Sequence, residues 1–273
     1  MNSKIKVITA LVITTFLLSS WAAAGELAAP KKYFLWPENR KAAVSLTFDD
    51  AIDNQAVNAA PLLKRYGLSG TFFLSGARWV KPENISKWNT VYEDGNELGA
   101  HTLNHPCQKE KALGTNSEDY TLEGMRAELK NQLTAFRDRG MYREPMVFAY
   151  PCGVTWVGND KRSYTPVVEQ LFSAARGYTD TFDRLLNDPL RVDLYEVQAG
   201  NIGGKSAAYL IEMVKDAEKK GEWVVFVFHG IGAGWLITET REFEDLLRYL
   251  NENRESVWTA PFGRIAEYVR NNR

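Results

Sequence analysis

The chain alternates short apolar segments with longer segments in which apolar residues recur every three or four positions. The short segments are rich in β-branched and aromatic residues, which predicts strands buried on both faces. The longer segments predict amphipathic helices that cover these strands. Strands are predicted at 41–48, 70–76, 97–100, 146–151, 191–197 and 223–230, and helices at 54–66, 82–93, 121–139, 165–175, 207–220, 241–253 and 261–270.

This alternation predicts an α/β fold with a parallel sheet. No linker rich in proline, glycine or serine interrupts residues 41–273, so we expect one domain. The most economical arrangement is a single (β/α) barrel, distorted or incomplete, with seven strands. Barrel enzymes place their chemistry where strands end and loops begin, which directs attention to the polar residues at those positions.

The N-terminus has the pattern of a secretory signal peptide, with two lysines, an apolar run over 7–18 and three alanines at 22–24. The run is shorter than the roughly 20 residues that span a bilayer, so we expect no membrane insertion after cleavage. The protein is therefore predicted to be secreted or periplasmic. The predicted parts are the signal peptide (1–24), a leader (25–40) and a catalytic domain (41–273).

Composition and charge exclude some classes of binding partner. The 273 residues are 45% hydrophobic with a net charge of −1, and no basic run occurs, so nucleic acid and anionic membranes are not expected to bind. The two cysteines, Cys107 and Cys152, make a disulfide plausible in a secreted chain. The oligomeric state leaves no signal in the sequence.

Candidate chemistry gathers at the predicted strand ends. Asp49 and Asp50 directly follow an apolar strand, and because like charges repel, two adjacent carboxylates indicate that a neighbouring group benefits from both charges. His101 and His105 follow the strand at 97–100, and four-residue spacing on a turn allows two imidazoles to share a metal at about 2.1 Å. His229 directly follows the apolar residues 223–228 of the last predicted strand.

A zinc-protease motif would require glutamate directly after the first histidine, where Thr102 stands, so that class is excluded. The segments TFDD at 47–50 and HTxxH at 101–105, together with the late strand before His229, resemble the polysaccharide deacetylases, the NodB-homology group of carbohydrate esterase family four. The resemblance runs from about Lys41 to the C-terminus and implies a NodB-like barrel.

The resemblance implies a polysaccharide deacetylase, a hydrolase acting on carbon–nitrogen bonds other than peptide bonds. Its expected substrate is an N-acetylhexosamine oligo- or polysaccharide, such as a chitooligosaccharide or peptidoglycan. One alternative is an O-acetyl esterase acting on xylan-type polymers. Others are a carbohydrate-binding protein that kept the barrel and lost catalysis, and a metal-independent hydrolase.

Roles carried over from the family place a divalent ion on Asp50, His101 and His105. Zinc is the expected ion, with cobalt and nickel as alternatives. Asp49 is then the catalytic base, and His229 is the general acid that protonates the leaving group. Thr102 matches the Ser/Thr that supports the histidine loop in the family, although a threonine that merely caps a turn fits equally well.

The third family motif, Arg-x-Pro-aromatic-Gly, is altered here. The segment AYPCG at 149–153 has Ala149 in place of the arginine and Cys152 in place of the aromatic residue, so the usual partner of the base is missing. Arg191, or less favourably Arg176, could replace it, although an ordinary surface arginine is expected for both. The backbone N–H of Cys152 is the expected oxyanion donor.

Four further assignments are open. Asp193 could orient His229, but a solvated carboxylate is the preferred interpretation. Cys107 could pair with Cys152 at the rim of the site, or serve as a thiolate metal ligand, which an oxidising compartment disfavours. Tyr150 and Trp235 are candidate substrate-binding residues, and Trp235 could instead pack its own loop.

Overall fold

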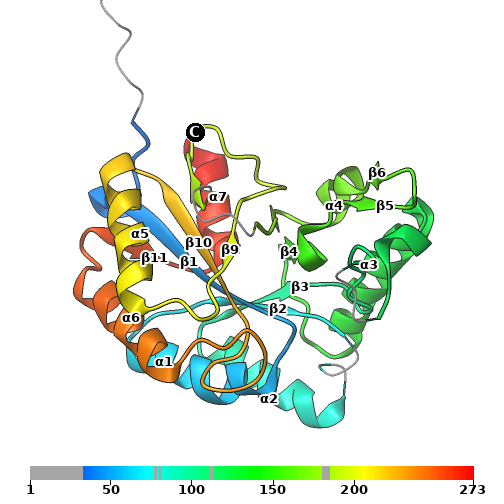
Figure 1. Ribbon diagram of the computed structural model, residues 1–273, viewed down its shortest axis with the longest axis horizontal. Helices are drawn as coiled ribbons and strands as arrows, with labels where there is room; N and C mark the ends of the chain where they lie inside the picture. Colours follow the sequence, from blue (N-terminus) through cyan, green and yellow to red (C-terminus); the bar gives the residue numbers. More distant parts are fainter. Residues whose placement is uncertain (1–32, 77–78, 80, 111–113, 180–184) are drawn as a thin grey trace, which may run out of the picture. The chain divides into compact units, whose positions relative to one another are not determined.

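The two longest strands described, β1 (Ala42–Asp49) and β10 (Trp223–Phe228), are buried at every residue. They pair in parallel, with Ala43 opposite Trp223 at one end and Phe48 opposite Phe228 at the other. Strands covered on both faces favour apolar side chains, and β10 is apolar throughout. β1 also buries Ser45 and Thr47, whose hydroxyls hydrogen-bond to Trp223 and to the carbonyl of Phe226. This pair lies inside the sheet, with further strands on either side of it (Figure 1).

The other strands extend this pair on both sides. Their bounds are β2 (Thr71–Leu74), β3 (Glu97–Ala100), β4 (Phe148–Ala149), β7 (Ala175–Arg176), β8 (Leu186–Asn187), β9 (Gly200–Asn201) and β11 (Val257–Thr259), with β5 (Trp156–Val157) and β6 (Arg162–Ser163) in a separate hairpin. The sheet order is β7-β4-β3-β2-β1-β10-β8, with β11 beside β1 and β9 beside β10. All pairs in this sheet are parallel except β8 with β10. Single-residue bridges from Arg176 to Val197 and from Thr179 to Gly200 curl the sheet without completing it, so the predicted incomplete barrel is confirmed.

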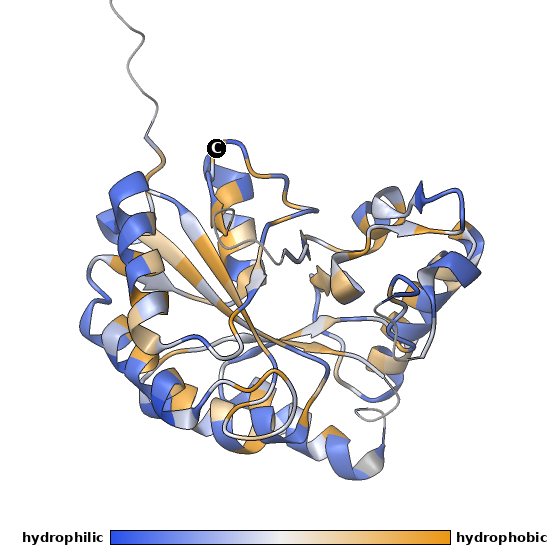
Figure 2. Cartoon of the chain, viewed as in Figure 1, coloured by the Kyte–Doolittle hydropathy of each residue, from blue (hydrophilic) through white to orange (hydrophobic). Residues whose placement is uncertain are grey.

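Two apolar cores lie on the two faces of the sheet. Val44, Leu46 and Phe48 of β1 belong to the larger core, whereas Ala43 belongs to the smaller one. Because successive side chains alternate between faces, Asp49 points to the same face as Ala43. The helices of the larger core are α1 (Ala60–Arg65), α2 (Pro82–Glu93), α3 (Leu122–Asp138), α4 (Thr165–Leu171), α5 (Ala207–Lys220) and α6 (Thr240–Glu252), while α7 (Phe262–Asn272) packs in the smaller one. Figure 2 shows the hydrophobic residues concentrated on the strands and the hydrophilic ones on the helices.

The computed structural model describes residues 33–273, apart from 77–78, 80, 111–113 and 180–184. The predicted signal peptide and the first part of the predicted leader therefore lie outside the described residues. The last part of the leader is packed on the domain, because Trp36 is buried and its indole donates a hydrogen bond to the carbonyl of Gly221 at 3.1 Å. Among the described helices, none is long and apolar enough to cross a membrane.

Several sequence-based boundaries were wrong. The predicted strand at 191–197 is a series of turns, in which only Val197 makes an isolated bridge. Its buried residues, Leu194 and Val197, produced the misleading apolar pattern. The predicted helix at 165–175 ends at Leu171 because the chain turns into β7, and the strand at 146–151 is reduced to the two residues of β4.

Candidate active site

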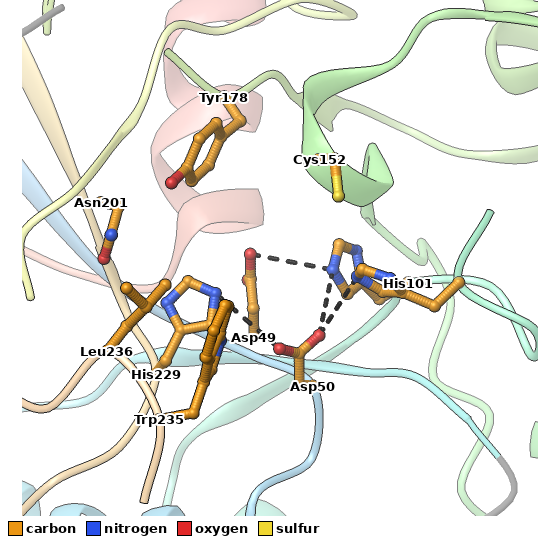
Figure 3. Close-up of a pocket in the computed structure, with 10 residues that line it drawn as sticks. Asp49, Asp50, His101, Cys152, Tyr178, Asn201, His229, Trp235 and Leu236 are labelled. Carbon is orange, nitrogen blue, oxygen red and sulfur yellow. Dashed lines mark ion pairs between the residues drawn. The ribbon is translucent and has the colours of Figure 1, made fainter. Parts of the chain in front are cut away.

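Five predicted side chains converge at the carboxyl edge of the sheet. Asp49 ends β1 and Asp50 follows it, His101 directly follows β3 with His105 four residues later, and His229 directly follows β10. All five line one pocket of about 450 Å³. Figure 3 shows the labelled carboxylates and imidazoles pointing toward one another. Parallel strands bring their carboxyl ends to one edge, so residues far apart in sequence meet there.

Three of these side chains form a group that could hold a metal ion. Oδ1 of Asp50 lies 3.3 Å from Nε2 of His105 and 3.6 Å from Nε2 of His101. The potential ligand atoms of this group all lie within 4.8 Å of one another. Two imidazoles and one carboxylate are a donor set that fits zinc and leaves a coordination position open. The residues present therefore fit the divalent ion that the sequence implied.

The protonation states of this group suit metal binding. Burial lowers the pKa of His101 to about 4, which keeps its imidazole neutral at pH 7. The same ring donates from Nδ1 to the carbonyl of Ala149 at 2.8 Å, so Nε2 turns its lone pair toward Asp50. Burial alone would raise the pKa of Asp50, but the hydrogen bond from His105 and the charges of the imidazoles outweigh it and hold this pKa well below its usual value.

His105 behaves differently from His101. Burial alone would lower its pKa, but the hydrogen bond and the negative charge of Asp50 outweigh burial and raise it. A metal ion must therefore compete with a proton for Nε2 of His105, so ion binding displaces that proton at low pH and becomes tighter as the pH rises.

The turn that carries the histidines is held by buried polar side chains. Thr102 and His105 adopt positive φ angles of 60° and 50°, which are uncommon for residues other than glycine. The hydroxyl of Thr102 accepts a hydrogen bond from the N–H of His105 at 2.9 Å. Gln132 of α3 accepts from the N–H of Thr102 at 2.7 Å, and Glu128 of the same helix accepts two more backbone N–H groups of the turn. These bonds hold the two imidazoles in place.

Asp49 has a buried arginine partner. One guanidinium nitrogen of Arg176, Nη2, lies 2.6 Å from each carboxylate oxygen of Asp49. Arg176 is fully buried, and its Nη1 donates to the carbonyl of Gly177 at 3.0 Å. Its guanidinium also lies over the ring of Phe73, 5.1 Å from the centroid. The missing arginine of the third motif is thus supplied from β7.

This finding corrects the sequence-based expectation, which ranked Arg191 first and expected a surface position for both arginines. Arg191 is exposed and pairs with Asp188 at 3.6 Å, close to it in sequence. Arg176 reaches Asp49 because β7 lies beside β4, where Ala149 stands opposite Arg176.

His229 is also buried, and its Nε2 lies 3.8 Å from Oδ2 of Asp50. Burial lowers the pKa of His229, partly offset by the charges of Asp49 and Asp50. Its Nδ1 has no hydrogen-bond partner among the described residues. Asp193 does not orient this ring, because it is exposed and its carboxylate accepts the N–H of Tyr195 at 2.8 Å.

Cys107 and Cys152 form a disulfide at the rim of the pocket. Sγ of Cys107 lies 3.6 Å from Nδ1 of His105, and Cys152 itself lines the pocket with a φ of 53°. The bond therefore joins the histidine loop to the loop that carries the expected oxyanion donor. Because both sulfur atoms are bonded to each other, the alternative in which Cys107 is a thiolate ligand is wrong for this oxidised state.

Removing this disulfide is expected to destabilise the protein. The bond closes a loop with a sequence separation of 45, for which chain entropy predicts a loss of about 4 kcal/mol in unfolding free energy. Urea unfolding of the protein with and without reductant measures the difference, and a Cys107→Ser/Cys152→Ser variant should be insensitive to reductant. Two free thiols on the denatured, unreduced protein would contradict this prediction.

The pocket walls contain residues that sequence reasoning missed. The pocket is also lined by Tyr178, which lies just after β7, Asn201, which ends β9, and Leu236, which lies in the loop after β10. None of these segments carries a recognisable sequence motif. Trp235 lines it too and is 54% exposed. Tyr150 does not contribute, because it is buried and its ring packs on Phe148 and Tyr164 in the larger core. Alternation along the chain after β4 turns Tyr150 away from the pocket.

Comparison with known proteins shows what the chain is similar to. Residues 37–164 match the family described as polysaccharide deacetylase. The chain is 32% identical over 127 residues to the peptidoglycan-N-acetylglucosamine deacetylase of Bacillus cereus, covering 45% of this chain and 53% of that protein. It is also 23% identical over 259 residues to a gellan lyase of a Bacillus species, covering 86% of this chain and 10% of that protein. The chain thus spans about half or less of these relatives.

Among solved structures, the chain is similar to the Xyl-CE4 domain of a multidomain xylanase from the hindgut metagenome of Trinervitermes trinervoides. The TM-score is 0.54 at 16% identity, and the match covers 84% of this chain and 91% of that one. At this identity the likeness shows a shared fold.

Proposed function

We propose that the chain is a member of the polysaccharide deacetylase family, whose model matches residues 37–164, and that it is a metal-dependent enzyme that hydrolyses N-acetyl groups of an N-acetylhexosamine oligo- or polysaccharide. The observation that carries the proposal is the convergence of a paired carboxylate, a metal-ligand group and a buried histidine on one pocket. A molecule that only bound glycans would need none of these three together. Secretion through a cleaved signal peptide is part of the proposal.

In the proposed reaction, the three residues Asp50, His101 and His105 hold the divalent ion. When bound, such an ion polarises the acetyl carbonyl and lowers the pKa of a water molecule. Asp49 accepts the proton of the attacking water, and Arg176 keeps its carboxylate oriented toward the pocket.

The other wall of the pocket completes the reaction. The backbone N–H of Cys152, a residue that lines the pocket, is the proposed donor to the oxyanion, and one such donor typically contributes about 2.7–4 kcal/mol to the transition state. His229, in its protonated form, gives a proton from Nε2 to the departing sugar nitrogen. The products are acetate and a free amine, so water supplies one proton and one hydroxyl to the broken bond.

N-acetyl substrates are proposed first because a relative that is 32% identical over 127 residues is named for N-acetylglucosamine deacetylation. The likeness to a domain of a xylanase keeps an O-acetyl esterase as the second candidate. Acetate release from a panel of N-acetylated and O-acetylated glycans, with zinc and after chelation, tests both. We expect zinc-dependent release from the N-acetylated set.

The opposite outcomes are informative. Release only from O-acetylated glycans would show that the substrate is an acetyl ester rather than an acetyl amide, while the metal-dependent hydrolysis would stand. Release that survives chelation would contradict metal dependence. No release by zinc-loaded protein, with glycan binding detected, would show a barrel that binds without cutting.

Trp235 is proposed to contact the sugar next to the reacting one, because it lines the pocket and keeps an exposed face. Trp235→Ala should raise the KM for long oligosaccharides about fivefold, corresponding to roughly 1 kcal/mol of lost apolar contact, with kcat unchanged. Trp156→Ala on β5, outside the pocket lining, is the matched control. An unchanged KM would assign Trp235 to packing of its own loop.

A further inference from the structure

A short turn just after the catalytic aspartates carries three amide side chains that reach toward the active site. Residues Gln55–Ala59 form a π-helical turn that leads into α1. Such turns insert an extra residue and occur often at functional sites because they redirect side chains. We call Asn54, Gln55 and Asn58 the amide clamp. Gln55 hydrogen-bonds to the carboxyl ends of β1 and β10, whereas Asn54 and Asn58 hydrogen-bond to the loop that follows β10.

Gln55 makes the most specific contact. Its Nε2 donates to the carbonyl of Asp49 at 2.6 Å and to the carbonyl of His229 at 3.0 Å. The side chain is fully buried. Two carbonyl acceptors require a donor, so they identify the nitrogen side of this amide without ambiguity.

The hydrogen bonds of Gln55 lie where the ladder between β1 and β10 ends. The ladder between β1 and β10 ends with Phe48 opposite Phe228, one residue before Asp49 and His229. Beyond that point the two strand ends would separate, and their buried carbonyls would lose partners at a cost of about 1–3 kcal/mol each. The amide of Gln55 bridges both carbonyls and so acts as one further rung of the ladder.

Asn54 and Asn58 contact a different part of the site. Asn54 donates to the carbonyl of Ala233 at 2.6 Å and accepts the N–H of Ile231 at 3.0 Å. Asn58 donates to the carbonyl of Ile231 at 2.8 Å. These bonds hold the loop that presents Trp235 to the pocket, rather than the base and the acid.

We propose that Gln55 is a positioning residue that sets the spacing between Asp49 and His229, while Asn54 and Asn58 position the pocket wall. The inference rests on the proposed function, because it assigns those two residues as base and acid. Misplacement of reacting groups by about 1 Å can cost 10²-fold in rate, so loss of this rung should appear in kcat. Two of the three proposed ligands, His101 and His105, lie on a turn that Gln132 and Glu128 hold separately, so zinc affinity should change far less than kcat.

The test compares variants of the clamp. Gln55→Glu replaces the donor with a carboxylate that faces two carbonyls, and Gln55→Met removes the donor without adding charge. Asn58→Asp makes the corresponding change against the loop, and Val57→Ala, at an exposed position of the same turn, is the control. For each we would measure kcat and KM for acetate release, zinc affinity and the thermal midpoint.

We expect both Gln55 variants to lose about 10- to 100-fold in kcat with KM and zinc affinity within about threefold of wild type. Asn58→Asp should instead raise KM, and Val57→Ala should match wild type. Wild-type kcat in both Gln55 variants would overturn the inference. The inference would also be overturned if the Gln55 variants and Asn58→Asp showed the same fall in kcat and the same rise in KM. That result would mean that the amide clamp supports the fold of the site in general.

A wild-type protein that releases no acetate from any glycan would count against the proposed function alone. Crystal structures of wild type and Gln55→Met then decide the inference independently of activity. A larger separation between the backbones of residues 49 and 229 in the variant would support a positioning role. An unchanged separation, with both side chains in place, would overturn it.

Discussion

Asp50→Asn and Asp49→Asn are both expected to abolish the proposed activity, but only Asp50→Asn should also lose the zinc, although the two residues are adjacent. Asp50→Asn removes the charged ligand of the group formed with His101 and His105. Changes that affect metal ligands only indirectly already lower metal affinity 10- to 100-fold, so zinc affinity should fall by more than about 100-fold and activity with it. Zinc content after dialysis, measured alongside acetate release, reports both effects.

Asp49→Asn should keep the zinc. Asp49 is bound by Arg176 at 2.6 Å and lies 3.8 Å from Nε2 of His101, and its proposed task is to accept a proton rather than to bind the ion. Losing a general base typically costs about 10²- to 10⁴-fold, so kcat should fall by that factor with zinc content near wild type.

The third carboxylate of the same segment supplies the control. Asp53 is exposed and pairs with Lys87 at 2.7 Å, so Asp53→Asn should retain both zinc and activity. If Asp49→Asn lost zinc as completely as Asp50→Asn, the division of roles between the two neighbours would be wrong.

The second large effect is expected at Arg176. Arg176→Met leaves the buried carboxylate of Asp49 without its cation, and removing one partner of a buried pair typically costs about 3–5 kcal/mol. Unfolding free energy from urea titration should fall by that amount, and kcat should fall by at least about 10²-fold because Asp49 is no longer held.

A double-mutant cycle separates these consequences. Adding Asp49→Asn to Arg176→Met removes the unpaired charge, so the double variant should recover much of the lost stability while staying inactive. Arg191→Met, at an exposed position, should change the unfolding free energy by less than about 0.5 kcal/mol. Full activity of Arg176→Met would show that Asp49 needs no partner to act.

The strand ends were the predictable part of the site. The residue pairs at 49–50 and 101–105, and the histidine at 229, each follow an apolar run, and runs of that kind mark strands whatever the rest of the chain does. Side-chain alternation and parallel pairing then bring these residues to one edge. The helices at 82–93 and 207–220 were also predicted to the residue, because their periodicity is local.

The supporting residues were not predictable in the same way. Arg176 stands in a segment that reads as the end of a helix, and its partner lies 127 positions away. Gln55 and Gln132 are polar residues within helical turns, where a solvated position is the ordinary expectation. Their burial depends on which helix packs over which strand end, and no local pattern records that.

The sequence by itself determined the alternation of strands and helices, the ligand-type residues at the strand ends and the two cysteines available for a bond. These follow from periodicity and from residue chemistry, which are properties of short segments. The tertiary structure decided that Arg176 pairs with Asp49, that Tyr150 faces the core, that Cys107 meets Cys152, and that an amide of Gln55 ties two strand ends together. Each of these contacts joins segments that only packing brings within reach, so each required the folded chain to be seen.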